Sequence, residues 1–209
     1  MQFEMKHVTT MIGNEKIIND VSFHVSKGEM LALVGHNGAG KSTLLKTTMN
    51  MIGKYSGEII IDGKYHIDKH LLTYKKHISY LPEEPLLLPE LTVMQHFQLY
   101  GISYAIDEED LKSRLNEYVE NFDLAGKLNM YPEELSKGMR QKVQAICAFL
   151  PDVKVLLIDE PFIGLDIYAR EYIVSLMQEK MRAGTSIILS THQLDVLNKL
   201  ANRYIVLDS

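Results

Sequence analysis

Eight consecutive residues near the start of the chain have the spacing of a phosphate-binding loop. They are Gly35, His36, Asn37, Gly38, Ala39, Gly40, Lys41 and Ser42, which fit the pattern G-x-x-x-x-G-K-S/T. Glycines let such a loop curl until backbone N–H groups and the start of the following helix point at a phosphate. We expect Lys41 to reach the β- and γ-phosphates and the Ser42 hydroxyl to bind Mg²⁺. The alternative, a glycine turn with an unrelated lysine, is disfavoured by the strand and helix predicted on either side.

Two adjacent carboxylates follow an apolar run later in the chain. Residues 153–158 predict a buried strand, and Asp159 and Glu160 come directly after it. Both acids therefore lie at the carboxyl end of a strand, where α/β sheets bind ligands. Neighbours on a strand point to opposite sides, so the two acids cannot share one role. We expect Asp159 to join a Mg²⁺ shell and Glu160 to orient and deprotonate an attacking water, with a solvated acidic turn as the alternative.

The elements that must position these residues follow the order of an α/β protein with a helical insertion. Strands are predicted at residues 3–8, 21–25, 30–34, 57–61, 78–81, 153–158 and 186–190. Helices are predicted at residues 41–52, 92–100, 108–122, 137–149, 168–181 and 194–202. Because strand signals vanish between residues 92 and 150, we predict one domain, residues 1–209, with an all-helical subdomain at 92–150.

Composition and charge exclude several classes of protein. Hydrophobic residues make up 46% and charged residues 23% of the 209 residues, as in a globular protein. The net charge of −5 argues against a nucleic-acid partner, which needs a basic surface. A single cysteine, Cys147, excludes an intramolecular disulfide. No signal peptide or apolar run long enough to span a membrane is visible, so we expect a cytosolic protein that acts on membranes only through a partner.

Three further stretches make nearly the whole chain resemble the ATP-binding subunit of an ABC transporter. They are Leu-Ser-Lys-Gly-Met-Arg-Gln-Lys at 135–142, Leu-Ile-Asp-Glu-Pro at 157–161 and Thr-His at 191–192, in the order of the family. The resemblance implies an α/β P-loop NTPase core with an N-terminal antiparallel β subdomain and an inserted helical subdomain. It also implies ATP and Mg²⁺ as cofactors, a membrane-spanning permease as partner, and a dimer with a second copy or a paralogous ATPase subunit. The chain would then lie at the inner face of the cell membrane.

The resemblance assigns roles to further residues. Ser136 and Gly138 match the signature motif, which the family offers to the γ-phosphate held by the other subunit. His192 matches the switch histidine that contacts the γ-phosphate, and Asp166 matches the aspartate of the D-loop. Thr43 directly follows the phosphate-binding loop and is included with the nucleotide-binding residues.

The sequence also departs from the family pattern. Lys137 and Met139 replace a glycine and the glutamine of the signature, a variant that resembles the ABC-2 and Ecs-like exporter branch. Glu83 stands where the family has a glutamine, and it would add a negative charge near Mg²⁺. Residues 162–164 lack the usual serine and alanine of the D-loop. The aromatic residue that stacks on adenine is missing, and Ile12 stands near its place.

Weaker signals lie between residues 66 and 89 and at the end of the chain. Leucines 86–88, enclosed by prolines, cannot all face one core; they are either partly packed or an apolar seat for the membrane partner. A metal site at His66 and His70 is possible but disfavoured, because no third ligand is evident. The chain ends at residues 208–209, just after an apparent strand, where family members usually continue, so we expect a truncated sequence.

These features favour a Mg²⁺-dependent ATPase subunit that energises a separate exporter of peptide, lipid or drug. The alternatives are a non-transport ABC ATPase acting on nucleic acid and a non-catalytic nucleotide-binding regulator. The first would need a long coiled coil, or two cassettes in one chain, and Lys41 and Ser136 are too close for such an insertion. The second is disfavoured by Glu160, and a GTPase by the lack of an N-K-x-D motif.

Overall fold

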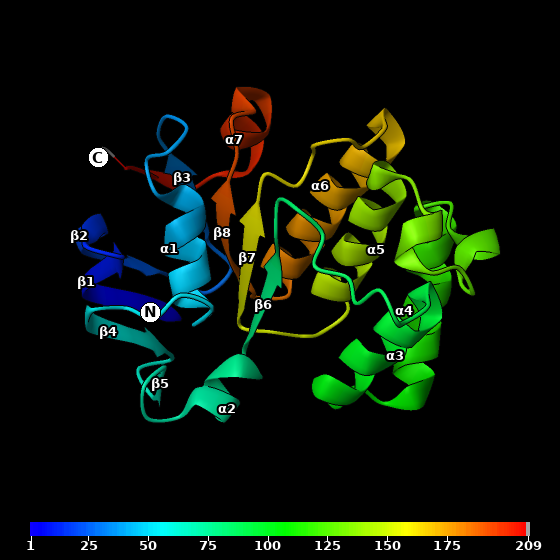
Figure 1. The fold of residues 1–209 in the computed structure, drawn as a ribbon, viewed down its shortest axis with the longest axis horizontal. Helices are drawn as coiled ribbons and strands as arrows, with labels where there is room; N and C mark the ends of the chain where they lie inside the picture. Colours follow the sequence, from blue (N-terminus) through cyan, green and yellow to red (C-terminus); the bar gives the residue numbers. More distant parts are fainter. Residues whose placement is uncertain (208–209) are drawn as a thin grey trace. The chain divides into compact units, whose positions relative to one another are not determined.

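The structure is a computed structural model that describes residues 1–207, except for the side chains of residues 194 and 196. Residues 208–209, where we expected a truncation, lie outside the described residues. The chain forms two compact units (Figure 1): the first contains residues 1–80, 153–160 and 178–207, and the second contains Leu81–Asp152 and Pro161–Met177. The expected boundaries of the helical subdomain, 92–150, stay a prediction.

An antiparallel sheet in the first unit has the strand order β2-β1-β4-β5. Its strands are β1 (Phe3–Ile12), β2 (Glu15–Val25), β4 (Ser56–Ile61) and β5 (Tyr65–His66). β1 and β2 form a hairpin in which Ile12 pairs with Glu15, and Gly13 takes a φ of 61° in the turn. Glycine tolerates that left-handed conformation without strain.

A five-stranded sheet in the first unit has the order β6-β7-β8-β3-β9. Its strands are β3 (Met30–Val34), β6 (Ile78–Leu81), β7 (Val155–Asp159), β8 (Ser186–Ser190) and β9 (Arg203–Val206). β3 pairs in parallel with β8 and β9, and β7 pairs in parallel with β8. The carboxyl ends of β3, β7 and β8 therefore meet at one edge of the sheet, where the phosphate-binding loop begins.

Helices α1 (Lys41–Thr48), α2 (Leu71–Lys75) and α7 (Leu194–Leu200) belong to the first unit, as does the end of α6 (Ile167–Arg182). α1, light blue in Figure 1, packs against β1, β2 and β7. One hydrophobic core joins both sheets to this helix through buried residues such as Phe3, Leu33, Leu45 and Leu157. This core fixes the helix that follows the loop.

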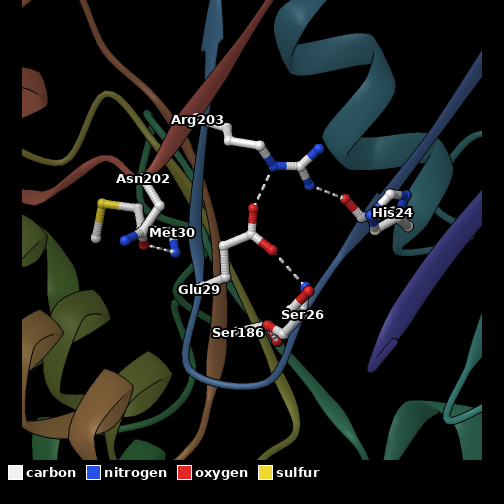
Figure 2. Close-up of polar contacts among 7 residues, drawn as sticks. All are labelled: His24, Ser26, Glu29, Met30, Ser186, Asn202 and Arg203. Carbon is white, nitrogen blue, oxygen red and sulfur yellow. Dashed lines mark hydrogen bonds and ion pairs between the residues drawn. The ribbon is translucent and has the colours of Figure 1, made fainter.

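A polar cluster ties β9 to the turn between β2 and β3. Figure 2 shows its members: His24, Ser26, Glu29, Met30, Ser186, Asn202 and Arg203. Arg203 donates from Nε to Glu29 Oε1 at 2.5 Å, and the Ser26 N–H donates to Glu29 Oε2 at 2.6 Å. Burial alone would raise the pKa of Glu29, but the hydrogen bonds from Arg203 and Ser26 and the charge of Arg203 hold it below its ordinary value. The cluster therefore anchors the outer strand β9.

The second unit contains α3 (Val93–Ser103), α4 (Glu108–Asn121), α5 (Lys137–Phe149) and the first part of α6. The short 3₁₀ turns Ala125–Lys127 and Pro132–Glu134 connect α4 to α5. Thr92, Asp107 and Ser136 cap α3, α4 and α5 by accepting backbone N–H bonds, which explains where these helices begin. α3, α4 and α5 contact one another.

The predicted fold class is confirmed, because a parallel sheet, an antiparallel sheet and helices are all present. Several predicted ends are wrong. The first two strands are longer than residues 3–8 and 21–25, and the first helix ends at Thr48, before Asn50 with its left-handed φ of 53°. β5 and α2 were not predicted. None of the helices in residues 1–207 is long and apolar enough to cross a membrane.

Candidate nucleotide-binding and hydrolysis site

The phosphate-binding loop connects β3 to α1 in the first unit. Lys41 is buried, and its Nζ donates to Gly35 O at 2.7 Å and to His36 O at 3.0 Å. Gly38 and Gly40 have φ values of 90° and 88°, which only glycine adopts without strain. Residues 36–38 are exposed, whereas the lysine is held beneath them. The loop therefore presents its outer face to solvent with the ammonium group already in place.

The start of α1 favours an anion. Ser42 and Thr43 are half-buried residues of its first turn, which contains no acidic side chain. The unpaired N–H groups of a helix start carry partial positive charge, and here no carboxylate neutralises it. This end of α1 can therefore bind phosphate.

Both ends of the loop are packed against other strands. A Cβ on Gly35 would come within 2.5 Å of Leu207 O, just beyond β9. A Cβ on Gly40 would come within 2.8 Å of Ile18 Cδ1 and 3.1 Å of Ile17 O on β2. Glycine is therefore needed at both ends of the loop, because a side chain would collide with the neighbouring backbone.

Asp159 is the last residue of β7, and its side chain is 1% exposed. The Tyr80 hydroxyl donates to Asp159 Oδ2 at 3.4 Å, while Oδ1 has no hydrogen-bond partner. The sequence analysis did not single out Tyr80, although it stands in the strand predicted at 78–81.

Glu160 has a left-handed φ of 42°, which is rare outside glycine and typical of strained functional sites. Its N–H donates to Ser190 O at 2.8 Å, and its Oε2 accepts the His192 N–H at 3.4 Å. His192 Nε2 lies 3.4 Å from Glu160 Oε1 but makes no hydrogen bond to it. Burial raises the pKa of Glu160 above its ordinary value, against the opposing effects of His192 and the Thr191 hydroxyl.

Buried oxygen atoms without partners gather at this edge of the sheet. Within the described residues, four buried side-chain atoms have no hydrogen-bond partner, and three of them are Asp159 Oδ1, Glu160 Oε1 and Ser190 Oγ. Asp159 and Ser190 are paired residues at the ends of β7 and β8. Each unsatisfied buried group costs about 1–3 kcal/mol. Such a concentration indicates a site built for a polar ligand.

The donor set at this edge fits Mg²⁺. A buried carboxylate oxygen from Asp159 and a hydroxyl from Ser42 are hard oxygen ligands, and Mg²⁺ binds few protein ligands beside phosphate and water. No group of three or more His, Cys, Asp or Glu residues among residues 1–207 is arranged to hold a metal. His66 and His70, the weaker candidates, have ring centroids 6.2 Å apart.

The signature residues lie in the second unit, where α5 meets the D-loop. Ser136 caps α5, and its Oγ accepts the Met139 N–H at 3.2 Å, which leaves the hydroxyl proton free to be donated. A Cβ on Gly138 would come within 2.6 Å of Gly164 O, so glycine is needed there. The structure thus places the signature helix directly against the loop that carries Asp166.

Asp166 is fixed by two contacts. Lys142 Nζ lies 2.7 Å from its Oδ2, and its Oδ1 accepts the Ala169 N–H at 2.9 Å. The hydrogen bond from Lys142 and that from Ala169 hold the pKa of Asp166 below its ordinary value. The D-loop and signature helix are therefore joined by an ion pair.

Glu83 and Ile12, the weakest of the expected site residues, are both exposed. Glu83 belongs to the second unit, and its place in a Mg²⁺ shell stays a prediction. Ile12 ends β1 and is 50% exposed. The hairpin residues that contact the phosphate-binding loop are Ile17 and Ile18, which the sequence analysis missed because it did not extend the second strand back to them.

A phosphate-binding loop and a strand-end acid pair on a parallel sheet define a P-loop nucleotide hydrolase. The chain belongs to the ABC transporter family, whose profile matches residues 18–163. Two structures agree. "Structure of ATP binding subunit of ABC transporter" has a TM-score of 0.94 and 36% identity, covering 99% of this chain and 86% of that one. "Dimeric structure of a post-hydrolysis state of the ATP-binding cassette MJ0796 bound to ADP and Pi" has a TM-score of 0.83 and 25% identity, covering 99% and 94%.

Curated relatives match over almost the full chain. The ABC-type transporter ATP-binding protein EcsA of Bacillus subtilis (strain 168) is 33% identical and covers 97% of this chain and 82% of its own. The SkfA peptide export ATP-binding protein SkfE of the same organism is 29% identical, covering 98% and 84%. The aliphatic sulfonates import ATP-binding protein SsuB of Bacillus thuringiensis subsp. konkukian (strain 97-27) is 31% identical, covering 98% and 78%. The chain is thus an ATP-binding subunit of an ABC transporter, and its relatives include both export and import proteins.

Proposed function

We propose that this chain is a Mg²⁺-dependent ATPase subunit that drives a separate membrane-spanning permease. The observation that carries the proposal is the group of partnerless buried oxygens on Asp159, Glu160 and Ser190. They lie at the ends of β7 and β8, and β8 is the direct neighbour of the strand that leads into the phosphate-binding loop.

Different residues of the first unit bind the phosphates and the metal ion. Lys41 and the N–H groups at the start of α1 bind the β- and γ-phosphates, with Thr43 in the same turn. Ser42 and Asp159 would hold Mg²⁺, which would neutralise phosphate charge when bound. On ATP binding, Lys41 exchanges its bonds to Gly35 O and His36 O for bonds to phosphate oxygens. Because the lysine is already buried, this exchange removes no further water from its ammonium group. Tyr80 steadies Asp159 through its hydroxyl.

Glu160 acts as the general base. Its carboxylate orients a water and accepts a proton from it, and the raised pKa makes it a better base than an ordinary glutamate. His192 lies beside the same carboxylate, just after β8, and we assign it to the γ-phosphate. The fixed, left-handed backbone at Glu160 limits the directions in which the carboxylate can point.

The second half of each site comes from another subunit. Ser136 has a hydroxyl proton to donate at a helix N-terminus, and Gly138 permits the close approach of the D-loop. We assign both residues to the ATP held by the opposite subunit, which is a second copy of this chain or a paralogous ATPase. Asp166, the D-loop aspartate, keeps its expected place among the nucleotide-binding residues. The dimeric structure of the ATP-binding cassette MJ0796 supports this assembly.

The permease partner binds at the leucine segment, 86–88. Leu86 and Leu88 are 56% and 47% exposed, although both are large and apolar. An apolar helix of the partner that binds on these leucines would account for their exposure. The signature variant and Glu83 favour export of a peptide, lipid or drug, and the relative SkfE is a peptide export protein. The relative SsuB is an import protein and argues against this direction. The chain works at the cytoplasmic face of the membrane through its permease.

Hydrolysis by the purified chain tests the proposal. We expect phosphate release from ATP with Mg²⁺, none with excess EDTA, and none from a Lys41→Ala variant that keeps its melting temperature. Mg²⁺-independent hydrolysis would overturn the metal assignment. No hydrolysis by the folded wild type at high concentration, or in vesicles with its permease, would overturn the enzyme assignment.

A further inference from the structure

Ser190 ends β8 with a buried hydroxyl group to which the proposed function gives no role. The residue is 0% exposed, and within residues 1–207 its Oγ has no hydrogen-bond partner. Its backbone is engaged, because Ser190 O accepts the Glu160 N–H at 2.8 Å. A buried hydroxyl without a partner destabilises the folded protein, since it has lost its bonds to water. Such a group indicates that a polar ligand binds beside it.

A second unbonded oxygen lies on the neighbouring strand. Ser190 pairs with Asp159 in the parallel register of β8 and β7, and Asp159 Oδ1 also has no hydrogen-bond partner among the described residues. Adjacent strands lie about 4.8 Å apart, and register partners project to the same face of the sheet. The other carboxylate oxygen, Asp159 Oδ2, accepts the Tyr80 hydroxyl at 3.4 Å. Two neighbouring side chains therefore each keep one oxygen unbonded, and these oxygens do not bond each other.

Both side chains project to the face of the sheet that α1 covers. Residues two apart on a strand share a face, so Asp159 lies on the same face as Leu157. Ser190 likewise lies on the same face as Ile188. Leu157 and Ile188 belong to the core that joins both sheets to α1, and the first turn of α1 contains Ser42, the other expected Mg²⁺ ligand. The unbonded oxygens therefore lie in the part of the first unit where the metal is expected.

We propose that Ser190 is a positioning residue for the metal: its Oγ and Asp159 Oδ1 accept the two hydrogens of one water of the Mg²⁺ shell. The inference rests on the proposed function, because it needs Mg²⁺ to bind beside Asp159. A single water commonly joins polar groups that make no direct bond, and Mg²⁺ keeps several waters when it binds proteins and phosphates. The hydroxyl then has two opposite effects, because it destabilises the protein without ligand and increases the affinity for the metal with its nucleotide.

Ser186 is a matched control on the same strand. It is also 0% exposed, but its Oγ donates to Ser26 O at 2.6 Å. Removing the Ser186 hydroxyl therefore breaks a hydrogen bond, whereas removing the Ser190 hydroxyl breaks none. The Ser190→Ala change also keeps the backbone carbonyl that accepts the Glu160 N–H. Its effects are therefore those of the hydroxyl alone.

The first measurement is the melting temperature in EDTA without nucleotide. We expect Ser190→Ala to melt at least about 2 °C above the wild type, because an unsatisfied buried group is removed. Ser186→Ala should melt at least about 2 °C below the wild type, because a satisfied bond is lost.

The second measurement is a ratio of two dissociation constants for a non-hydrolysable ATP analogue: the value in EDTA divided by the value in excess Mg²⁺. We expect this ratio to fall by at least about fivefold in Ser190→Ala, the lower end of typical coupling between two ligands. In Ser186→Ala it should stay within about twofold of the wild type. The dissociation constant in EDTA should be the same in all three proteins, which assigns the effect to the metal.

The outcomes separate the inference from the function on which it rests. A wild-type ratio near one would refute the Mg²⁺ assignment, and the inference with it. A wild-type ratio of about tenfold or more that stays within about twofold in Ser190→Ala would refute the inference alone. So would a Ser190→Ala variant that melts below the wild type, because the hydroxyl would then have a partner within the protein. Should Ser190→Ala not fold, Ser190→Cys makes the same test with a weaker hydrogen-bonding group.

Discussion

His192 approaches both carboxylate oxygens of Glu160: its N–H donates to Oε2 at 3.4 Å, and its Nε2 lies 3.4 Å from Oε1. These contacts hold His192, just after β8, against the carboxylate of Glu160, just after the adjacent strand β7. The arrangement leaves Oε1 buried and without a hydrogen bond. We expect this oxygen to accept a hydrogen bond from the attacking water when nucleotide is bound.

Replacing Glu160 with Gln removes the base and keeps the shape. We expect turnover to fall by roughly 10²- to 10⁴-fold, the usual contribution of a positioned base, while ATP binding persists. Trapped ATP should also hold two subunits together, which light scattering would detect. Glu84→Gln makes the same chemical change at an exposed glutamate and should leave hydrolysis unchanged. Normal turnover in Glu160→Gln would remove Glu160 from the mechanism.

The raised pKa of Glu160 gives two pH dependences. Hydrolysis should decline, as pH falls, at a higher pH than the ordinary glutamate value of 4.5 predicts, because the base becomes protonated. The folded state binds this proton more tightly than the unfolded state does. The contribution of Glu160 to the free energy of unfolding is therefore fully present at low pH and is lost as pH rises through the pKa of the folded state. Glu160→Gln should therefore melt higher than the wild type at neutral pH, and the difference should shrink below pH 4.5. A constant difference across pH would show that burial does not raise this pKa.

Shared sites predict recovery on mixing. Lys41→Ala chains lack the phosphate lysine, and Ser136→Arg chains lack the signature serine, so each variant alone should hydrolyse almost nothing. A mixed dimer contains one site with both wild-type halves. ATPase activity should reappear on mixing, and wild-type activity should rise faster than linearly with protein concentration. Two folded variants that show no recovery would argue against the shared site or show that both sites must act together, which the concentration dependence distinguishes.

The exposed leucines make a stability prediction. Because Leu86 and Leu88 are about half exposed, replacing both with Ser should change the free energy of unfolding by no more than about 0.5 kcal/mol each. Truncating Leu135, which is buried in the same unit, to Ala should lower the free energy of unfolding by about 2–5 kcal/mol. Thermal melts measure both, and retention of the variant on the immobilised permease measures docking. Unchanged retention of the double variant would exclude the leucines as the seat.

Much of the fold could be predicted because its pattern is local. Continuous apolar runs marked β3, β7 and β8, and helix caps with apolar periodicity marked α3 to α5. The missed parts lacked such a pattern. β2 is an edge strand whose first residues are polar and mostly exposed, so alternation began only at residue 21. β5 has two residues and α2 five, too few for any periodicity.

The site was predictable as motifs, and its supporting contacts were not. Lys41, Asp159 and Glu160 are readable from spacing, because strand, loop and helix place them in a fixed order. The Tyr80 hydroxyl bonds to Asp159 and the Leu207 carbonyl packs against Gly35, although each pair is far apart in the sequence. Their types are ordinary for a strand, so nothing in the sequence separates them from core residues. The positions of Glu83 and Ile12 in the site stay predictions.

Without an aromatic residue near Ile12, affinity should come mainly from the phosphates and Mg²⁺. Stacking of a base on an aromatic ring contributes roughly 1–3 kcal/mol in single-strand binding proteins, and an aliphatic side chain recovers only part of it. We expect GTP to compete within roughly tenfold of ATP, and Ile12→Tyr to bind ATP more tightly with the same rate at saturation. Leu72→Tyr, at another exposed position of the first unit, is the control. Strong rejection of GTP by the wild type would show that another residue reads the base.

The central position of β3 has a consequence for synthesis of the protein. Met30 pairs with Ile187 and Leu31 pairs with Arg203, so the strand that leads into the phosphate-binding loop finds neither neighbour until most of the chain has left the ribosome. At about 5–20 residues per second, β3 remains without sheet partners for on the order of ten seconds or more. The carbonyl of Leu207, which packs against Gly35, arrives later still. Nucleotide affinity is therefore gained only after residue 207 has been synthesised, and ATP binding distinguishes a folded nucleotide-binding core from a nascent one.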